Sequence, residues 1–158
     1  MKTLILVRHA KSDWPEDTDD FDRPLADKGI HDAENMAEHL KKESITIDRF
    51  LSSPALRAFT TCQLFNEVYN VPVETLQQLY NASESVFENL ITEIPDGFNS
   101  VAMFSHNNGI SNFANSMSEQ VFMMPTCGVA GFEIDCDSWS EFHDATKRLA
   151  FFYEPKKI

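Results

Sequence analysis

The amino-acid sequence predicts an α/β fold of three layers, α/β/α, in which helices cover both faces of a mostly parallel central sheet. Three apolar runs have the pattern of buried strands, and they lie at Leu4–Val7, Ile47–Leu51 and Ser100–Ser105. Each is followed by a segment whose apolar residues recur every three or four positions, as on one face of a helix. This alternation of strand and helix is typical of a parallel sheet that is covered on both sides.

Residues 1–158 are expected to form one domain, because the chain is long enough to bury a core and 42 % of it is hydrophobic. The three cysteines are an odd number without a CxxC pair, so the sequence predicts neither a disulfide framework nor a zinc site. The opening apolar stretch is too short for a signal peptide, and no run approaches the roughly 18 apolar residues that span a bilayer. We therefore expect a cytoplasmic protein without a membrane partner.

The formal net charge of −12 makes nucleic acid an improbable partner, because the overall field of the protein repels phosphate polyanions. An anionic substrate would therefore need a local positive pocket.

Several helices are expected to begin at capping residues. Asp27 is the candidate N-cap of the first helix, and Gly29 in its first turn permits the close approach of another segment. Ser53 is expected to cap a second helix that starts at Pro54, and Ser83 a third.

The other elements are assigned from the same patterns. Val71–Leu76 is expected to be a short strand, and the polar segment Lys11–Asp22 an exposed loop beside the first strand. A fourth helix is expected around Ile110. Near the end of the chain, Gly128–Ile134 and Arg148–Tyr153 are predicted to pair as a hairpin across a polar connection.

Polar side chains with complementary chemistry follow three of the predicted strands. Arg8 and His9 end the first strand, Arg57 lies in the first turn of the helix after the second, and His106 follows Ser105 at the end of another. Because the carboxyl ends of parallel strands share one edge of a sheet, we expect these residues to meet there. Guanidinium groups grip a phosphoryl group bidentately, and an imidazole offers a nitrogen nucleophile. A second histidine can stabilise charge that develops in the transition state.

Four sequence blocks in this order resemble the histidine phosphatase (phosphoglycerate-mutase-like) superfamily. They are Leu6–Trp14, which contains an Arg-His pair like that of the family's Arg-His-Gly signature, Asp22–Gly29, Ser52–Thr61 and Ser105–Asn107. The short chain, with no inserted cap, is most similar to phosphohistidine phosphatases of the SixA type. The resemblance implies that His9 is the nucleophile that becomes transiently phosphorylated. It also implies that Arg8, Arg57 and His106 complete the catalytic, substrate-binding pocket, with no metal and no cofactor.

The chain departs from the family pattern at three places. Ala10 replaces the glycine of the signature, and Pro15 stands where mutase relatives have a phosphate-binding asparagine. Relatives that act on phosphate monoesters carry an acidic proton donor in the segment that corresponds to Tyr80–Glu84, where this chain has only Glu84. Glu84, Asp13 and Glu16 are the candidates for a general acid.

The scarcity of proton donors in this segment bears on the identity of the substrate. An alkoxide leaving group needs a proton, whereas the imidazole of phosphohistidine is a much less basic leaving group. The leading hypothesis is a phosphatase that acts on phosphohistidine in a protein partner, such as a histidine phosphotransfer domain. The alternatives are a phosphatase of a small phosphorylated metabolite and a non-catalytic module that binds phosphoproteins. A mutase is disfavoured, because re-transfer of the phosphoryl group requires a closed site.

Overall fold

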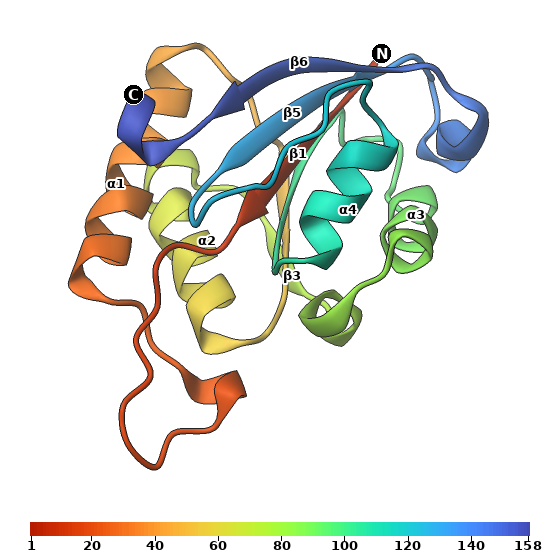
Figure 1. Cartoon of the computed structure of the whole chain (residues 1–158). Helices are drawn as coiled ribbons and strands as arrows, with labels where there is room; N and C mark the ends of the chain where they lie inside the picture. Colours follow the sequence, from red (N-terminus) through yellow and green to blue (C-terminus); the bar gives the residue numbers. More distant parts are fainter.

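A six-stranded sheet with the strand order β3-β2-β4-β1-β5-β6 forms the centre of the fold (Figure 1). The computed structural model describes all 158 residues. The strands are β1 (Lys2–Arg8), β2 (Arg49–Ser52), β3 (Val73–Thr75), β4 (Ser100–Ser105), β5 (Val129–Ile134) and β6 (Lys147–Tyr153). Strands β3, β2, β4 and β1 pair in parallel, whereas β5 is antiparallel to both β1 and β6. The mostly parallel sheet and the terminal hairpin confirm the predictions.

Helices cover both faces of the sheet, which confirms the predicted three layers (Figure 1). The α-helices are α1 (Asp27–Lys42), α2 (Leu56–Tyr69), α3 (Glu84–Thr92) and α4 (Gly109–Ser116). Four short 3-10 helices complete the chain, namely η1 (Asp20–Asp22), η2 (Gln77–Asn81), η3 (Trp139–Asp144) and η4 (Pro155–Lys157). Helices α1 and α2 pack on one face, and α3 and α4 pack on the other.

Strand β1 shows why its apolar run is uninterrupted. Leu4 and Leu6 belong to the core beneath α3 and α4, whereas Ile5 and Val7 belong to the core beneath α1 and α2. All four side chains are fully buried, and such burial contributes roughly 1.5–3 kcal/mol per side chain. The middle of a strand that is covered on both faces has no position for a polar residue, so the apolar run continues from Leu4 until the strand ends at Arg8.

The register of the sheet aligns the strand ends that carry the candidate residues. Arg8 at the end of β1 pairs with Ser105 at the end of β4, and Ser52 at the end of β2 pairs with Phe104. The segments that follow these three strands therefore leave the sheet side by side at one edge.

Two helices do not begin where the sequence predicted: α1 begins one residue earlier and α2 two residues later. The N-cap of α1 is Ala26 rather than Asp27, because the Ala26 N–H donates to the carbonyl oxygen of Lys11 at 2.9 Å and keeps the chain extended. Helix α2 starts at Leu56 instead of Pro54, and the Ser53 hydroxyl contacts a histidine instead of capping the helix.

The third helix begins as predicted. The Ser83 side chain caps α3 and accepts a hydrogen bond from the Val86 N–H at 3.4 Å.

Two glycines allow segments near the strand ends to come together. A Cβ atom at Gly29 would overlap the carbonyl group of Lys11, so α1 lies directly against the segment that follows β1. A Cβ atom at Gly109, the first residue of α4, would likewise overlap the carbonyl oxygen of Ala82. The close approach predicted for Gly29 is confirmed.

The connection between β5 and β6 is less polar than the sequence suggested. Trp139 and Phe142 of η3 are fully buried and extend the core beneath α3 and α4. Burial of these two large side chains holds the connection against the core, although the residues between them are polar. No helix in the structure is long and apolar enough to cross a membrane.

Candidate active site

The residues predicted from the three strand ends come together at one edge of the sheet. His9 and His106 lie with their ring centroids 5.2 Å apart, and the positive charges of Arg57 and Arg8 both act on His9. His9, Arg57 and His106 are buried, and Arg8 is half-buried. The structure therefore assembles two imidazoles and two guanidinium groups from the ends of β1 and β4 and the start of α2.

The hydrogen bonding of His9 determines which ring nitrogen is free. Nδ1 lies 2.7 Å from the carbonyl oxygen of Ala10, which only accepts hydrogen bonds, so Nδ1 carries the proton. In this tautomer Nε2 holds the lone pair. Burial, together with the charges of Arg57 and Arg8, lowers the pKa of His9 to about 4. The imidazole is therefore neutral at pH 7 and able to act as a nucleophile.

Thr61 ties the nucleophile to the helix that carries Arg57. The Thr61 hydroxyl accepts a hydrogen bond from the Ala10 N–H at 3.0 Å and donates to the carbonyl oxygen of Arg57 at 2.8 Å. Ala10 is fully buried, and its methyl group fits where the family signature has glycine. The substitution at this position therefore leaves the loop around His9 intact.

Unsatisfied donors mark the position of an anion. Only four buried side-chain polar atoms in the chain lack a hydrogen-bond partner, and three of them are Arg8 Nε, Arg57 Nε and His106 Nδ1. A buried donor without a partner costs about 1–3 kcal/mol. Such donors persist where a ligand supplies the missing acceptor, and two guanidinium groups select an anion such as a phosphoryl group.

Backbone and carboxylate oxygens accept hydrogen bonds from one outer nitrogen of Arg8 and from both outer nitrogens of Arg57. Arg8 Nη1 donates to the carbonyl oxygen of Met124 at 3.0 Å. Arg57 Nη1 donates to the carbonyl oxygen of Asp20 at 2.6 Å, and Arg57 Nη2 donates to Asp20 Oδ2 at 3.1 Å. In each arginine the Nε–H is left without a partner.

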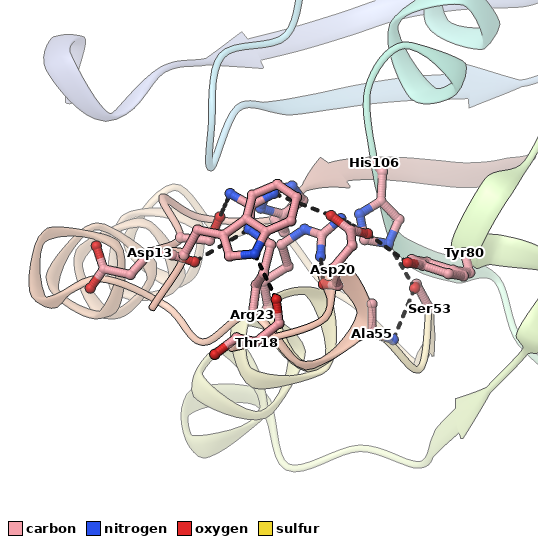
Figure 2. Close-up of polar contacts among 12 residues, drawn as sticks. Asp13, Thr18, Asp20, Arg23, Ser53, Ala55, Tyr80 and His106 are labelled. Carbon is pink, nitrogen blue, oxygen red and sulfur yellow. Dashed lines mark hydrogen bonds and ion pairs between the residues drawn. The ribbon is translucent and has the colours of Figure 1, made fainter. Parts of the chain in front are cut away.

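Ser53, the residue that follows β2, holds the side chain of His106. Its Nε2 lies 2.7 Å from Ser53 Oγ, which also accepts the Ala55 N–H at 3.2 Å (Figure 2). Burial, and secondly the neighbouring His9, lower the pKa of His106 to about 3, so this imidazole is also neutral at pH 7. When the Ser53 hydroxyl donates to Nε2, Nδ1 carries the proton and is a donor for an anionic oxygen.

Asp20 is a site residue that sequence reasoning missed. It lies in η1, within the segment expected to be an exposed loop, and its carboxylate contacts Arg57, Arg23 and Tyr80 (Figure 2). The hydrogen bond from Tyr80 and the hydrogen bond from Arg57 lower the pKa of Asp20 to about 2. Five aspartates lie in this segment, and the only sequence signal for Asp20 is its position three residues before Arg23 of a family block.

Arg23 adds a third guanidinium group at the rim. Its Nη2 donates to Ser12 Oγ at 2.8 Å, and its Cζ lies 4.4 Å from the ring centroid of Trp14. The charge of Arg23 also contributes to the low pKa of His9. Arg23 belongs to a sequence block that resembles the family, but no pattern in the sequence indicates its position at the rim of the site.

The candidate general acids are not part of the hydrogen-bond network of the catalytic residues. The side chains of Asp13, Glu16 and Glu84 are exposed, and none of them makes a hydrogen bond or ion pair with His9, Arg57 or His106. Pro15 is exposed as well. No group of three or more His, Cys, Asp or Glu side chains is arranged to hold a metal ion.

The family model of the histidine phosphatase superfamily (branch 1) matches residues 4–119, which is most of the chain. The chain belongs to this superfamily. Among solved structures, that of an Agrobacterium tumefaciens protein assigned as the phosphohistidine phosphatase SixA is 26 % identical, with a TM-score of 0.85 over 98 % of both chains. The protein histidine phosphatase SixA in complex with tungstate shares the fold at 23 % identity, with a TM-score of 0.79 over 98 % of this chain and 97 % of that one.

Relatives found by sequence include both uncharacterized proteins and mutases. An uncharacterized protein of Mycobacterium tuberculosis is 26 % identical over 161 residues, which cover 95 % of this chain and all of that protein. A 2,3-bisphosphoglycerate-dependent phosphoglycerate mutase of Thermoplasma acidophilum is 42 % identical over 84 residues, half of this chain and 40 % of the mutase. The superfamily and the SixA-like neighbours together support phosphatase activity for this chain.

Proposed function

We propose that this protein is a cytoplasmic, metal-independent phosphatase that hydrolyses phosphohistidine in a protein partner through a phosphorylated His9. The neutral imidazole of His9, with its lone pair on Nε2, supports the role of nucleophile. The unpartnered donors of Arg8, Arg57 and His106 support the binding of the phosphoryl group. All three cysteines are free, in keeping with a reducing compartment.

In the first half-reaction His9 Nε2 attacks the phosphorus of the substrate. A bond forms between Nε2 and phosphorus, and the bond between phosphorus and the substrate imidazole breaks with its electron pair going to the departing nitrogen. The guanidinium groups of Arg8 and Arg57 and the imidazole of His106 stabilise the charge on the phosphoryl oxygens. Arginine side chains thus supply the positive charge that a metal ion supplies in other phosphoryl-transfer enzymes.

In the second half-reaction a water molecule attacks the same phosphorus. The bond between phosphorus and His9 Nε2 breaks, the electron pair returns to the imidazole, and inorganic phosphate leaves. The hydrogen bond to Ala10 keeps the proton on Nδ1, so the lone pair returns to Nε2 when the phosphorus–nitrogen bond breaks, and His9 is ready for the next substrate.

The ionisation of Asp20 supports the preference for phosphohistidine over alkyl phosphate esters. Asp20 is the carboxylate that contacts the site, and its pKa of about 2 keeps it ionised at neutral pH, so it has no proton to donate. An alkoxide leaving group would need such a proton, whereas a phosphohistidine ring that is protonated on its other nitrogen leaves as a neutral imidazole, a weak base whose conjugate acid has a pKa of about 6.5. Cleavage of a P–N bond is therefore favoured over cleavage of an alkyl phosphate ester.

Exposed aromatic side chains beside the site favour a protein substrate. Trp14 is 61 % exposed and Phe21 is 36 % exposed, and they flank Arg23 and Tyr80 respectively. Aromatic residues are enriched at protein interfaces. A phosphorylated protein, for example a histidine phosphotransfer domain, can contact this rim while its phosphohistidine enters the pocket. We propose neither nucleic acid nor a membrane as a partner, because the net charge is −12.

The test compares turnover of a phosphohistidine peptide, p-nitrophenyl phosphate and an alkyl phosphate, with and without EDTA. We expect fast cleavage of the peptide, slow cleavage of the alkyl ester, no effect of EDTA, and loss of all turnover in His9→Ala. His31→Ala is the matched control, because His31 is exposed on α1. Efficient alkyl ester cleavage would instead indicate a metabolite phosphatase. Phosphate binding without any turnover would indicate a binding module.

A further inference from the structure

Tyr80 links two segments that lie far apart in the chain. It lies in η2, and its phenolic O–H donates to Asp20 Oδ2 at 2.5 Å (Figure 2). The same carboxylate oxygen accepts Arg57 Nη2, and the Asp20 carbonyl oxygen accepts Arg57 Nη1. Tyr80, Asp20 and Arg57 thus form a continuous chain of hydrogen bonds, of which only the last member is a predicted phosphate ligand.

Tyr80 and Asp20 lie in segments that differ in how firmly they are held. Helix η2 is fixed to the end of β4, because the Ser105 hydroxyl donates to the carbonyl oxygen of Leu79 at 2.7 Å and Leu79 is fully buried. Asp20, by contrast, lies in the long connection between β1 and α1 (Figure 1). Tyr80 therefore connects the sheet scaffold to the segment that carries Asp20, in addition to the contacts that Arg57 and Arg23 make with Asp20.

The consequence for Arg57 concerns which of its donors is free. Asp20 occupies both Nη atoms, and the buried Nε–H has no partner in the protein. A guanidinium group held in this way has one orientation, and it keeps Nε–H available for a phosphoryl oxygen. If Asp20 were free to move, its carboxylate and carbonyl oxygen would no longer define that orientation.

The ring of Tyr80 makes further contacts with the site. It packs edge-on against His106, with centroids 5.6 Å apart, and against Phe21, with centroids 5.2 Å apart. A phenylalanine would preserve both contacts and remove only the hydrogen bond to Asp20. The two functions of the side chain can therefore be separated by one substitution.

We propose that Tyr80 is a positioning residue, which acts through Asp20 to fix the guanidinium group of Arg57 for phosphoryl binding and transfer. This inference rests on the proposed function for its effect on turnover. Its effect on phosphate binding stands without that function, because the hydrogen-bond chain orients Arg57 whether or not His9 reacts.

The test is a double-mutant cycle of Tyr80→Phe and Asp20→Ala, measured with a phosphohistidine peptide. Tyr80→Phe is expected to lower kcat about tenfold with a smaller change in KM, because a hydrogen bond to a charged group positions a transition-state ligand. In the Asp20→Ala background, Tyr80→Phe is expected to change kcat by less than about twofold, because the acceptor is already gone. Tyr69→Phe is the matched control, since the Tyr69 hydroxyl donates to the Ile45 carbonyl oxygen away from the site.

Binding of inorganic phosphate, measured by calorimetry on the same four proteins, separates the two claims. Tyr80→Phe is expected to weaken phosphate binding severalfold in the wild-type background and to leave it unchanged in the Asp20→Ala background. Wild-type kcat and phosphate affinity in Tyr80→Phe would overturn the inference, as would equal losses in both backgrounds, which would indicate a merely structural role. Absence of turnover in the wild-type protein would overturn the proposed function, while the phosphate measurements would still decide the role of Tyr80.

Discussion

His9 and His106 face each other across the candidate site with ring centroids 5.2 Å apart, and both imidazoles are neutral at physiological pH. Two protonated imidazoles at this distance, beside Arg8 and Arg57, would repel each other. Burial removes the water that would stabilise their charges, so the pKa of each ring falls well below its ordinary value. This pairing sets the pH behaviour of the protein.

Activity is expected to persist at mildly acidic pH. Only the neutral form of His9 is nucleophilic, and its pKa of about 4 keeps that form dominant until the pH approaches this value. The expected profile of kcat/KM for a phosphohistidine peptide is therefore free of any decline centred near 6.5, the ordinary pKa of histidine. The rate of the His9→Ala protein is subtracted at each pH to remove spontaneous hydrolysis. A decline centred near 6.5 would show that His9 is not desolvated as described.

Stability is expected to fall as the solution becomes acidic. Below about pH 6.5 the unfolded chain protonates its histidines, whereas folded His9 and His106 stay neutral down to about pH 4 and about pH 3. The unfolded state then binds more protons. The free energy of unfolding therefore decreases as the pH is lowered through this window, by on the order of 3 kcal/mol per group. Above about pH 6.5 neither group contributes, because both are neutral in both states.

Urea unfolding at a series of pH values measures this effect. In His9→Gln and His106→Gln the decline between about pH 6.5 and pH 4 should be shallower than in the wild type, because one proton-linked group is missing from each. The exposed His31 provides a control substitution, His31→Gln, that should leave the slope unchanged. Equal slopes in all four proteins would refute the burial of neutral imidazoles.

Arg57→Lys should impair the enzyme even though it preserves the positive charge. Lysine lacks the planar fork that binds the carbonyl oxygen and Oδ2 of Asp20 together, and it has no equivalent of the free Nε–H. We expect kcat/KM for the phosphohistidine peptide to fall by about a hundredfold, the loss that follows removal of an oriented transition-state donor. Arg49→Lys is the control, since Arg49 pairs with Glu74 at the start of β2, away from the site. Comparable activity of both variants would mean that charge alone suffices at position 57.

Gly29→Ala should destabilise the fold. The new methyl group would overlap the carbonyl group of Lys11 and force α1 away from the segment that follows β1, at a cost of about 1–3 kcal/mol. Gly97→Ala is the matched control, because no atom lies within 4 Å of a Cβ at that position. Urea unfolding of both variants measures the difference. Equal stability would show that α1 does not press against Lys11 in solution.

The sequence was sufficient to predict the sheet and the residues at its edge. Periodicity identified β1 and β4, since a strand buried on both faces leaves a continuous apolar run, and the strand ends then located Arg8, His9 and His106. Helix starts were less predictable. Asp27 and Ser53 are good capping residues, yet tertiary contacts of Lys11 and of His106 determined where α1 and α2 begin.

Asp20 and Tyr80 could not be predicted, because their role depends on contact between segments far apart in the chain. Asp20 has the same local sequence signals as its four neighbouring aspartates, and only the fold brings it to Arg57. Tyr80 looks like an ordinary aromatic residue in a connection, and its hydrogen bond to Asp20 spans 60 positions of the sequence. The general-acid candidates Asp13, Glu16 and Glu84 were chosen by position alone, and in the structure none of them makes a hydrogen bond or ion pair with His9, Arg57 or His106.

His9 Nε2 is proposed to carry the phosphoryl group during turnover. Rapid quenching in base during hydrolysis of a phosphohistidine peptide, followed by mass spectrometry of proteolytic fragments, detects this intermediate. We expect a base-stable, acid-labile phosphoryl group on the fragment that contains His9, and none in His9→Ala. Steady turnover of the peptide by His9→Ala at the wild-type rate, or a phosphoryl group on His106 instead, would contradict it.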